Sequence, residues 1–530
     1  MNYNNFDKLA AYKRLLDLAP RGKGFDFASQ LTAERVRKAV VPLAAGLTYS
    51  WAAKAVDAPV LEALQALADE QELMEKYQAV IDGETVNTGE NRKVLHHLLR
   101  GQLGRPVLHE GKNLGEFYAL ELERFSSFAA AVHAGTIRGS TGKAFTTAVQ
   151  IGIGGSDLGP RALYLALENW AAAEGKGHLQ AKFISNVDPD DASQAAASCT
   201  LEETIFVLVS KSGTTQETLA NELFVKDKLI TVGLDPSKHI VAVTSESSPL
   251  AHNPAYLDSF YIDDFIGGRY SSTSAVGGVI LSLAFGPEVF KQLLAGAHEA
   301  DKNALEPKVL ANAALLDALI GVWERNFLGY PYTAILPYSQ ALSRFPAHLQ
   351  QLDMESNGKR VNREGLPVSY STGPVVFGEP GTNGQHSFYQ LLHQGTDIVP
   401  LQFVGFTESQ RRDDVKVDGS VSQTKLKANL AAQIVAFAKG KTDPNRNKEF
   451  LGGRPSSLIY GKRLTPQALG ALLAHFENKV MFQGFVWNIN SFDQEGVQLG
   501  KVLTKKVLAA KAGGNSGDST LDAYSEILGI

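Results

Sequence analysis

The spacing of apolar residues changes near residue 145 of this chain. Up to about residue 100 they recur every three to four positions, as in Leu61–Leu67 and Val94–Arg100, with sparse glycine and proline and no obvious strand. Such spacing is typical of amphipathic helices. We therefore predict a helical N-terminal region over residues 1–120.

Beyond Phe145 the pattern becomes one of short apolar runs, each ending in Gly, Ser or Thr and followed by a helical pattern. This alternation predicts buried parallel strands joined by crossover helices, which is an α/β fold. The first series predicts one domain over residues 121–290, and its runs are Val149–Ile153, Ala181–Ile184, Ile205–Val209 and His239–Val243.

A second series follows a helical stretch near Ala304–Asn326 and predicts a second α/β domain over residues 291–511. Its runs are Thr333–Leu336, Pro374–Phe377, Ile398–Phe403 and Phe485–Ile489. Residues 512–530 are expected to form a tail, in which Gly513–Gly517 is a flexible hinge before an amphipathic end at Thr520–Leu528.

The uncharged stretch Tyr270–Pro287 has almost the length of a membrane span. Its truly apolar part, Ala275–Phe285, is too short to cross a hydrocarbon layer of about 30 Å, so a buried helix is predicted instead. The N-terminus lacks the basic start and apolar segment of a signal peptide. We expect a soluble, cytoplasmic protein that does not bind a membrane.

Composition and charge narrow the function classes. The 530 residues exceed what one hydrophobic core usually supports, which is about 250–300 residues. Lys and Arg number 51 against 56 Asp and Glu, so no basic field is available to bind nucleic acid. The single cysteine, Cys199, cannot form an internal disulfide, which fits a reducing compartment. The 49 glycines are in slight excess, and several of them fall in two loops.

The first loop, Gly152–Pro160, directly follows a predicted strand. Its glycines would let backbone N–H groups approach an anion, although tight packing of a turn explains them equally well. It is not a dinucleotide fingerprint, because Asp157 stands where the third glycine is needed.

The second loop, Ser210–Glu217, combines four hydroxyls, an amine and a glycine after the run Ile205–Val209. These groups could bind a phosphate dianion through O–H, N–H and charge together. A Ser/Thr helix cap with a capping-box glutamate is the alternative. One cap does not need so many hydroxyls, so phosphate binding is favoured.

The candidate nucleotide-binding motif is incomplete, and the zinc-binding motif is absent. Gly496–Lys501 resembles a P-loop, but it has one spacer residue too few and Val502 in place of the Ser or Thr that would hold Mg²⁺. No H-E-x-x-H zinc motif occurs. We expect no nucleotide, other cofactor or metal.

Four further residues indicate acid–base chemistry. Glu355 follows a Met and precedes a Gly stop, His386 lies in a glycine-rich loop entering the helical pattern Ser387–Gln394, and Arg269 sits between Gly-Gly and hydroxyls. Lys501 is expected one turn into a helix after another strand-end loop. Each is ordinary alone, since Glu355 could be a helix-face charge and His386 a capping or core histidine. Together with a phosphate loop they predict proton transfer on a small phosphorylated substrate.

Six motifs in order, from about Gly152 to Lys501, closely resemble the glucose-6-phosphate isomerase (phosphoglucose isomerase) family. They read GIGGSDLGP, SKSGTTQET, GGRYSSTSAVG, MESNGK, GEPGTNGQHSFYQ and SFDQEGVQLGK. The resemblance implies two flavodoxin-like sugar-isomerase domains with parallel-sheet α/β/α layers. It also implies interconversion of glucose 6-phosphate and fructose 6-phosphate in glycolysis and gluconeogenesis, without cofactor or metal, by a homodimer with shared active sites.

The resemblance further implies a role for each matched residue. Glu355 would shuttle a proton between C2 and C1 through a cis-enediol, Arg269 would stabilise the enediolate, and His386 from the neighbouring subunit with Lys501 would open the sugar ring. The substrate-binding residues implied are Gly155 and Ser156 at the sugar, Ser210, Lys211, Ser212, Gly213, Thr214 and Thr215 at the phosphate, and Gln351 and Gln494 positioning the substrate.

Two alternative functions would use some or all of these residues. A non-catalytic sugar-phosphate sensor would need the phosphate loop but not Glu355, His386 and Lys501 together, which argues against it. An isomerase for another sugar phosphate, such as a mannose or amino-sugar phosphate, would keep all of them.

Overall fold

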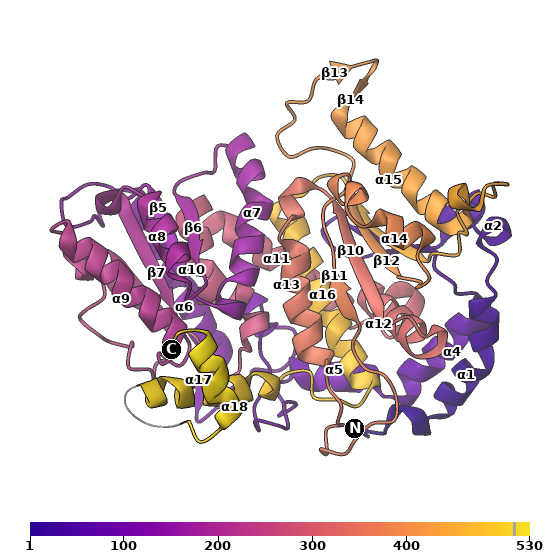
Figure 1. Ribbon diagram of the computed structural model, residues 1–530, viewed down its shortest axis with the longest axis horizontal. Helices are drawn as coiled ribbons and strands as arrows, with labels where there is room; N and C mark the ends of the chain where they lie inside the picture. The colour runs from indigo at the N-terminus through magenta and orange to yellow at the C-terminus, as the bar shows by residue number, and fades with distance from the viewer. Residues whose placement is uncertain (512–515) are drawn as a thin grey trace. The chain divides into compact units, whose positions relative to one another are not determined.

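The computed structural model describes residues 1–511 and 516–530, which form two compact units, Met1–Ser491 and Phe492–Ile530. The large unit contains two main β-sheets with their covering helices (Figure 1). The small unit contains α17 (Gln498–Lys511) and α18 (Ser519–Ile527), so the amphipathic end expected at Thr520–Leu528 is confirmed as a helix. The hinge expected at Gly513–Gly517 lies outside the described residues except for its last two positions. The domain boundaries at residues 120, 290 and 511 stay predictions.

The first sheet has five parallel strands in the order β6-β5-β7-β8-β9. All four strands predicted for it are present, whereas β9 was not anticipated. Strands β5, β7 and β8 are buried along their whole length, which explains the nearly continuous apolar runs of β7 and β8. The strands are β5 (Thr147–Ile151), β6 (Gln180–Ile184), β7 (Thr204–Val209), β8 (Ile240–Thr244) and β9 (Asp258–Tyr261).

Helices cover this sheet in two groups. Helices α8 (Pro189–Ala197) and α9 (Gln216–Thr231) contribute to one apolar cluster with β5 and β7. Helix α10 (Ala275–Phe285) packs against α6 (Leu114–His133) and α7 (Leu158–Ala173). All eleven residues of α10 are buried, so the predicted buried helix is confirmed. Among the helices of the described residues, none is long and apolar enough to cross a membrane.

The second sheet has six strands in the order β1-β2-β15-β12-β10-β11. The last four run parallel to one another, while β1 and β2 are antiparallel to their neighbours. The expected runs at Thr333, Pro374 and Ile398 are confirmed as strands β10, β11 and β12. The strands are β1 (Val40–Pro42), β2 (Thr48–Ala53), β10 (Tyr332–Tyr338), β11 (Val375–Phe377), β12 (Leu401–Phe406) and β15 (Ser456–Gly461).

Three sequence expectations about these elements were wrong. The N-terminal region is not free of strands, because β1 and β2 extend the second sheet. The run Phe485–Ile489 is not a strand, because Phe485 and Val486 end helix α16 (Pro466–Val486), whose last residues are buried and apolar. The helical spacing at Val94–Arg100 yields only a 3-10 turn, η2 (Leu98–Arg100).

Helix α16 is buried along nearly its whole length, and α11 (Pro287–Asn303) and α12 (Ala313–Trp323) pack along it. Buried charges fix this contact. The fully buried Arg100 side chain pairs with Glu477 of α16, and its Nη1 lies 3.0 Å from Asp301 Oδ2 of α11. These paired charges set the relative position of three elements inside the large unit.

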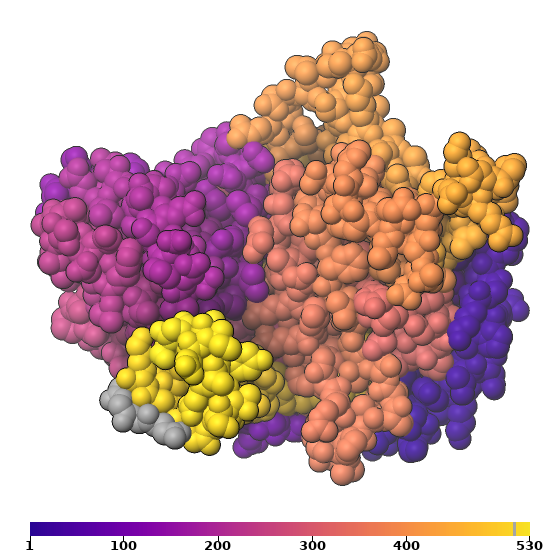
Figure 2. Space-filling model, viewed as in Figure 1, coloured from indigo at the N-terminus to yellow at the C-terminus, as the bar shows by residue number. Residues whose placement is uncertain are grey.

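The remaining elements lie around the two sheets. A hairpin of β13 (Lys416–Val417) and β14 (Ser420–Val421) projects from the large unit ahead of α15 (Ser422–Lys439), as Figures 1 and 2 show. The other elements are α1 (Ala10–Lys23), α2 (Phe27–Gln30), α3 (Ala33–Lys38), α4 (Ala58–Glu70), α5 (Leu73–Ile81), β3 (Leu108–His109), β4 (Lys112–Asn113), α13 (Phe345–Gln350) and α14 (Tyr389–Gln394).

Candidate active site

The first glycine loop forms a 3-10 turn, η3 (Gly154–Ser156), between β5 and α7. A β-carbon at Gly155 would lie only 2.2 Å from the carbonyl carbon and oxygen of Gly268, so no larger residue fits there. The close-packing explanation therefore applies to Gly155. It brings the loop against the Gly267–Ser272 segment and leaves Ser156 half-buried beside it.

Arg269 is held rigidly in the 3-10 helix η6 (Gly268–Thr273), where it is 1% exposed. Its Nε donates to Ser356 Oγ at 2.6 Å, and its Nη2 donates to the carbonyl oxygen of Ser491 at 2.5 Å. Its Nη1 lies 3.8 Å from Glu355 Oε2. The guanidinium is thus oriented by two fixed acceptors and faces a carboxylate.

Glu355 ends a π-helical turn, η10 (Gln351–Glu355), that continues α13. Gln351 and Glu355 are four positions apart and share one side of this turn. Glu355 Oε2 and Gln351 Oε1 are both buried, and neither has a hydrogen-bond partner within the described chain. A β-carbon at Gly154 would lie 3.4 Å from Gln351 Nε2, so this amide faces the glycine loop. Buried acceptors without partners are costly, and a bound ligand with hydroxyl groups would satisfy them.

Tyr270 completes this cluster, because its hydroxyl lies 3.0 Å from Ser356 Oγ. Burial raises the pKa of Tyr270 to about 12, so the phenol stays neutral near pH 7. The structure thus brings together Gly155, Arg269, Gln351 and Glu355, all predicted from sequence. Sequence reasoning missed Ser356, although it directly follows Glu355, and it missed the carbonyl of Ser491.

The second loop lies between β7 and α9, and its hydroxyls face one another. Ser210 Oγ donates to Thr215 Oγ1 at 3.1 Å, and both the N–H and the hydroxyl of Thr214 donate to Ser212 Oγ. Gly213 has φ of +65°, and a β-carbon there would lie 2.1 Å from Ser248 Oγ. Ser212 and Thr214 are exposed.

The N-terminus of α9 tests the helix-cap alternative for this loop. Thr215 is the residue that precedes the helix, and its side chain makes no capping hydrogen bond. The helix-cap alternative is therefore wrong. The first N–H groups of a sixteen-residue helix, together with nearby hydroxyls, form an arrangement that favours an anion.

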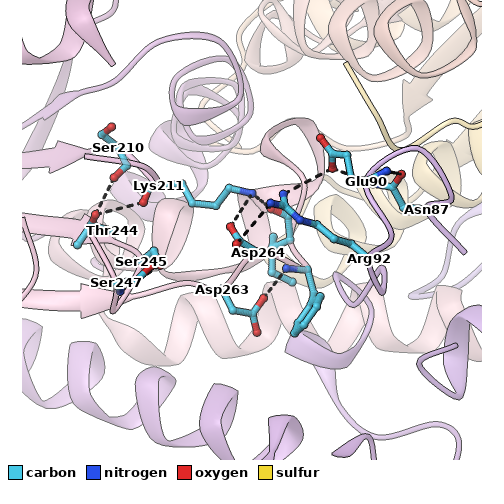
Figure 3. A network of polar contacts seen from close by, with 12 residues as sticks. Asn87, Glu90, Arg92, Ser210, Lys211, Thr244, Ser245, Ser247, Asp263 and Asp264 are labelled. Atoms are coloured by element: carbon cyan, nitrogen blue, oxygen red, sulfur yellow. Dashed lines mark hydrogen bonds and ion pairs between the residues drawn. The ribbon is translucent and has the colours of Figure 1, made fainter. Parts of the chain in front are cut away.

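The Lys211 side chain leads away from this loop toward Asp264 and Arg92 (Figure 3). Its Nζ donates to the carbonyl oxygen of Ile266 at 3.1 Å and lies 4.0 Å from Asp264 Oδ1. Arg92 Nη2 lies 3.5 Å from Asp264 Oδ2. Burial lowers the pKa of Lys211, and Asp264 opposes that shift. Lys211 therefore offers its backbone to the loop, while its ammonium links the loop to the segment that leads into Arg269.

His386 lies in a 3-10 turn, η11 (Asn383–His386), and not at the start of the helix expected at Ser387, because α14 begins at Tyr389. Its side chain is exposed and makes no hydrogen bond or ion pair with the residues that the structure describes. The single chain therefore does not tie His386 to Glu355.

Gln494 and Lys501 belong to the small unit, Phe492–Ile530. Gln494 precedes the 3-10 turn η13 (Glu495–Val497), and Lys501 lies one turn into α17, as predicted. The segment before them is the end of α16 and not a strand, so the expected strand-end loop is wrong. The roles assigned to both residues stay predictions.

Asp353, on the opposite side of the π-turn from Gln351 and Glu355, was also missed. Burial raises its pKa to about 7, Lys479 opposes the shift and Asp317 adds to it. An unfolded aspartate titrates near pH 4, so between about pH 4 and 7 the folded state binds more protons than the unfolded state. Stability contributed by this group is therefore present below pH 4 and is lost as the pH rises through 7.

We expect Asp353→Asn to remove this pH dependence. From pH 5 to pH 8 the wild-type free energy of unfolding should fall by about 1–3 kcal/mol more than that of the variant. Urea unfolding of both proteins at pH 5 and pH 8 gives the change in free energy of unfolding for each. The contributions of the other titrating groups cancel when the change for the variant is subtracted from that for the wild type. Equal pH dependence in both proteins would contradict a raised pKa at Asp353.

Comparison with known proteins gives a consistent result. A family model described as phosphoglucose isomerase matches residues 50–524. The chain is 60% identical to a glucose-6-phosphate isomerase from Treponema denticola, with all of both chains covered. It is 48% identical to one from Borreliella burgdorferi, with 99% of both covered.

Solved structures agree. A glucose-6-phosphate isomerase from Chlamydia trachomatis superposes with a TM-score of 0.92 at 42% identity, covering 99% of this chain and 100% of that one. A hypothetical protein from Thermus thermophilus has a TM-score of 0.65 at 27% identity, covering 84% of this chain and 97% of that one.

Proposed function

The chain belongs to the phosphoglucose isomerase family, and on that premise we propose that it interconverts glucose 6-phosphate and fructose 6-phosphate through a cis-enediol, without cofactor or metal. The observation that carries the proposal is the ion pair of Arg269 with Glu355, in which Nη1 lies 3.8 Å from Oε2. This Oε2 atom is buried and has no hydrogen-bond partner in the described chain. A cytoplasmic location is part of the proposal and fits a chain with one cysteine.

Glu355 acts as the base and acid of the isomerisation. Its carboxylate removes the proton from C2 of the open-chain aldose and returns it to C1, and a hydroxyl proton moves from O2 to O1, which yields the ketose. An ionised carboxylate held beside the substrate suits proton abstraction next to a carbonyl group. Gln351, on the same side of the π-turn, positions the sugar hydroxyls beside it.

Arg269 stabilises the negative charge that develops on the enediolate oxygen. Its guanidinium is buried and is oriented by Ser356 and Ser491, so little reorganisation is needed when the charge appears. A fixed cation of this kind supplies the charge stabilisation that a metal supplies in other enzymes. Gly155 and Ser156 line the sugar site beside it.

The phosphate is bound by the second loop. Ser210, Ser212 and Thr215 offer hydroxyls, and backbone N–H groups near Lys211 and Thr214 lie in the same loop before α9. The Thr214 N–H donates to Ser212 Oγ in the structure and would exchange that bond for one to the phosphate. Hydrogen bonds to a charged group are each worth roughly 1.5–3 kcal/mol, so the loop provides much of the substrate affinity.

Removing two of these hydroxyls should weaken substrate binding. We expect Ser212→Ala with Thr215→Ala to raise KM for glucose 6-phosphate by at least about 100-fold, because two hydrogen bonds to a dianion are lost. The value of kcat should change much less, since neither hydroxyl meets C1 or C2. Ser127→Ala, at an exposed serine of α6, is the control. An unchanged KM in the double variant would count against this phosphate site.

The reaction is tested directly by following both sugar phosphates in EDTA. We expect full activity, since no step of the proposal uses a metal. Loss of activity with the chelator, or turnover only of a mannose or amino-sugar phosphate in a substrate panel, would refute the proposal. Tight binding of glucose 6-phosphate without turnover would indicate a sensor instead.

Two copies of the chain form the enzyme, and each supplies His386 to the site of the other, where it opens the sugar ring with Lys501. The exposed side chain of His386 supports this arrangement, because a partner can reach it. Symmetric dimers are the commonest assembly in which one surface serves two equivalent sites.

Mixing two inactive variants tests the shared site. Mixed dimers of Glu355→Gln and His386→Gln contain one site with both native residues, so refolding an equal mixture should restore about a quarter of the wild-type activity. Each variant refolded alone should stay near its own low rate. Absence of any recovery, with mixed dimers demonstrated by a tag on one variant, would place His386 and Glu355 in the same chain.

A further inference from the structure

A cavity of about 30 Å³ lies on the side of the π-turn η10 away from Glu355. Side chains from several elements of the large unit line it. The charged and polar ones used below are Lys54, Asp317, Glu324, Asp353, Lys479 and Gln483. It is distinct from the sugar site, whose residues Arg269, Gln351 and Glu355 do not line it.

Asp353 faces this cavity with an unsatisfied carboxylate. The residue is 8% exposed, and its Oδ1 is buried without a hydrogen-bond partner in the described chain. Gln483 also lines the cavity, and its Oε1 is likewise buried without a hydrogen-bond partner in the described chain. Leaving a buried polar atom unsatisfied is unfavourable, and above about pH 7, where Asp353 is ionised, both atoms are acceptors that need a donor.

The charges on Lys54 and Glu324, and those on Lys479 and Asp317, are already paired, and Arg325 Nε donates to the carbonyl oxygen of Thr372. Lys54 Nζ donates to both carboxylate oxygens of Glu324. Lys479 Nζ lies 2.9 Å from Gln402 Oε1 and 3.1 Å from Asp317 Oδ2, which uses two of its three N–H groups. Lys54 and Lys479 each keep a third N–H, and Lys479 is the one whose charge acts on Asp353.

Water is the ligand that fits these groups. A cavity needs roughly 10–15 Å³ of such volume for one water molecule and two to four polar partners. Two acceptors and one ammonium donor meet that requirement. We propose that this cavity binds one or two water molecules, through which Lys479 holds Asp353, so that Asp353 is a positioning residue for Gln351 and Glu355.

The inference rests on the proposed function, because it concerns the placement of the proposed base. The π-turn is fixed on its substrate side by the bond from Arg269 to Ser356. On its other side the water would link it to α16, the buried helix at the centre of the large unit. This link would add to the direct bond from Asn357 Nδ2 to the carbonyl oxygen of Val480 in α16 and resist a rotation that carries Glu355 away from C1 and C2.

A crystal structure of the wild-type protein tests the water site without reference to activity. We expect at least one ordered water within hydrogen-bond distance of Asp353 Oδ1, also in contact with Lys479 Nζ or Gln483 Oε1. A dry cavity would overturn the proposal. If the protein proved not to be an isomerase, this measurement would still decide whether the site binds water.

Activity tests the positioning role with three variants. Asp353→Leu keeps much of the volume but removes the acceptor, and it should lower kcat roughly 10- to 100-fold with KM nearly unchanged, since a misplacement of about 1 Å can cost that much. Asp353→Asn keeps an acceptor oxygen and should retain kcat within about threefold. The control Val376→Ala enlarges the same cavity from strand β11 without removing a polar group, and it should lower stability but not kcat.

Other results would overturn the proposal. Wild-type kcat in Asp353→Leu would show that Asp353 does not act on the base. An equal loss of kcat in Val376→Ala would show that packing alone is responsible. If Asp353→Leu does not fold, the retained water and activity of Asp353→Asn decide, and loss of either would refute the role.

Discussion

Replacing Glu355 by glutamine is expected to lower kcat by about 10²- to 10⁴-fold, the usual contribution of a general base. The amide cannot accept the proton from C2, whereas its size and its contacts with the sugar are nearly those of the acid. KM for glucose 6-phosphate should therefore change little. The buried Oε2 beside Arg269 is the atom whose loss matters.

Solvent exchange identifies the lost step. In D₂O the wild-type protein should incorporate deuterium at C2 of glucose 6-phosphate, and the Glu355→Gln variant should do so at a rate reduced as much as kcat. Glu364→Gln, at an exposed glutamate nearby in the chain, is the matched control and should keep wild-type activity. Unimpaired exchange in the Glu355 variant would assign the base to another residue.

Arg269→Lys is expected to lower kcat by roughly 10²- to 10³-fold, although the positive charge is kept. The guanidinium reaches Ser356, the carbonyl of Ser491 and Glu355 at the same time, through three different nitrogens. A lysine ammonium is a single point and cannot replace that planar set of donors. The lysine ammonium would then lie displaced from the enediolate oxygen or pair with another group, and it would stabilise the developing charge less.

Binding of a five-carbon hydroxamate, which mimics the enediolate, separates this role from a structural one. Its affinity should fall in parallel with kcat in Arg269→Lys, whereas KM for glucose 6-phosphate should rise much less. Arg360→Lys, at an exposed arginine, should leave both unchanged. If kcat fell while the hydroxamate bound as tightly as before, Arg269 would not stabilise the enediolate.

The strands that sequence could predict are those buried on both faces. Strand β7 reads as a nearly continuous apolar run because it is buried along its whole length. Strand β15 begins with two serines and β2 contains Ser50 and two alanines, so neither has a strong local signal. Their partners come from distant parts of the chain. Local spacing also could not distinguish the end of the buried helix α16 from a strand.

The predicted site residues were those in long matched motifs, and the structure unites Arg269, Gln351 and Glu355. The π-turn, which places Asp353 on the side opposite Gln351 and Glu355, could not be predicted from the sequence. Whether a helical turn holds an extra residue depends on the packing around it. The contact of Arg269 with the Ser491 carbonyl was equally hidden, since a backbone oxygen has no sequence signature.

Pairing of β2 with β15 has a consequence for how the protein is made. Strand β2 emerges early from the ribosome, but its partner β15 is synthesised only after most of the chain. Until then β2 has no hydrogen-bond partner on that side, and contacts between such distant segments form slowly. A nascent chain cut short before β15 would expose an open strand edge, which is a template for aggregation. The second sheet therefore can be completed only near the end of translation, and β1 and β2 stay unpaired with the rest of the sheet until then.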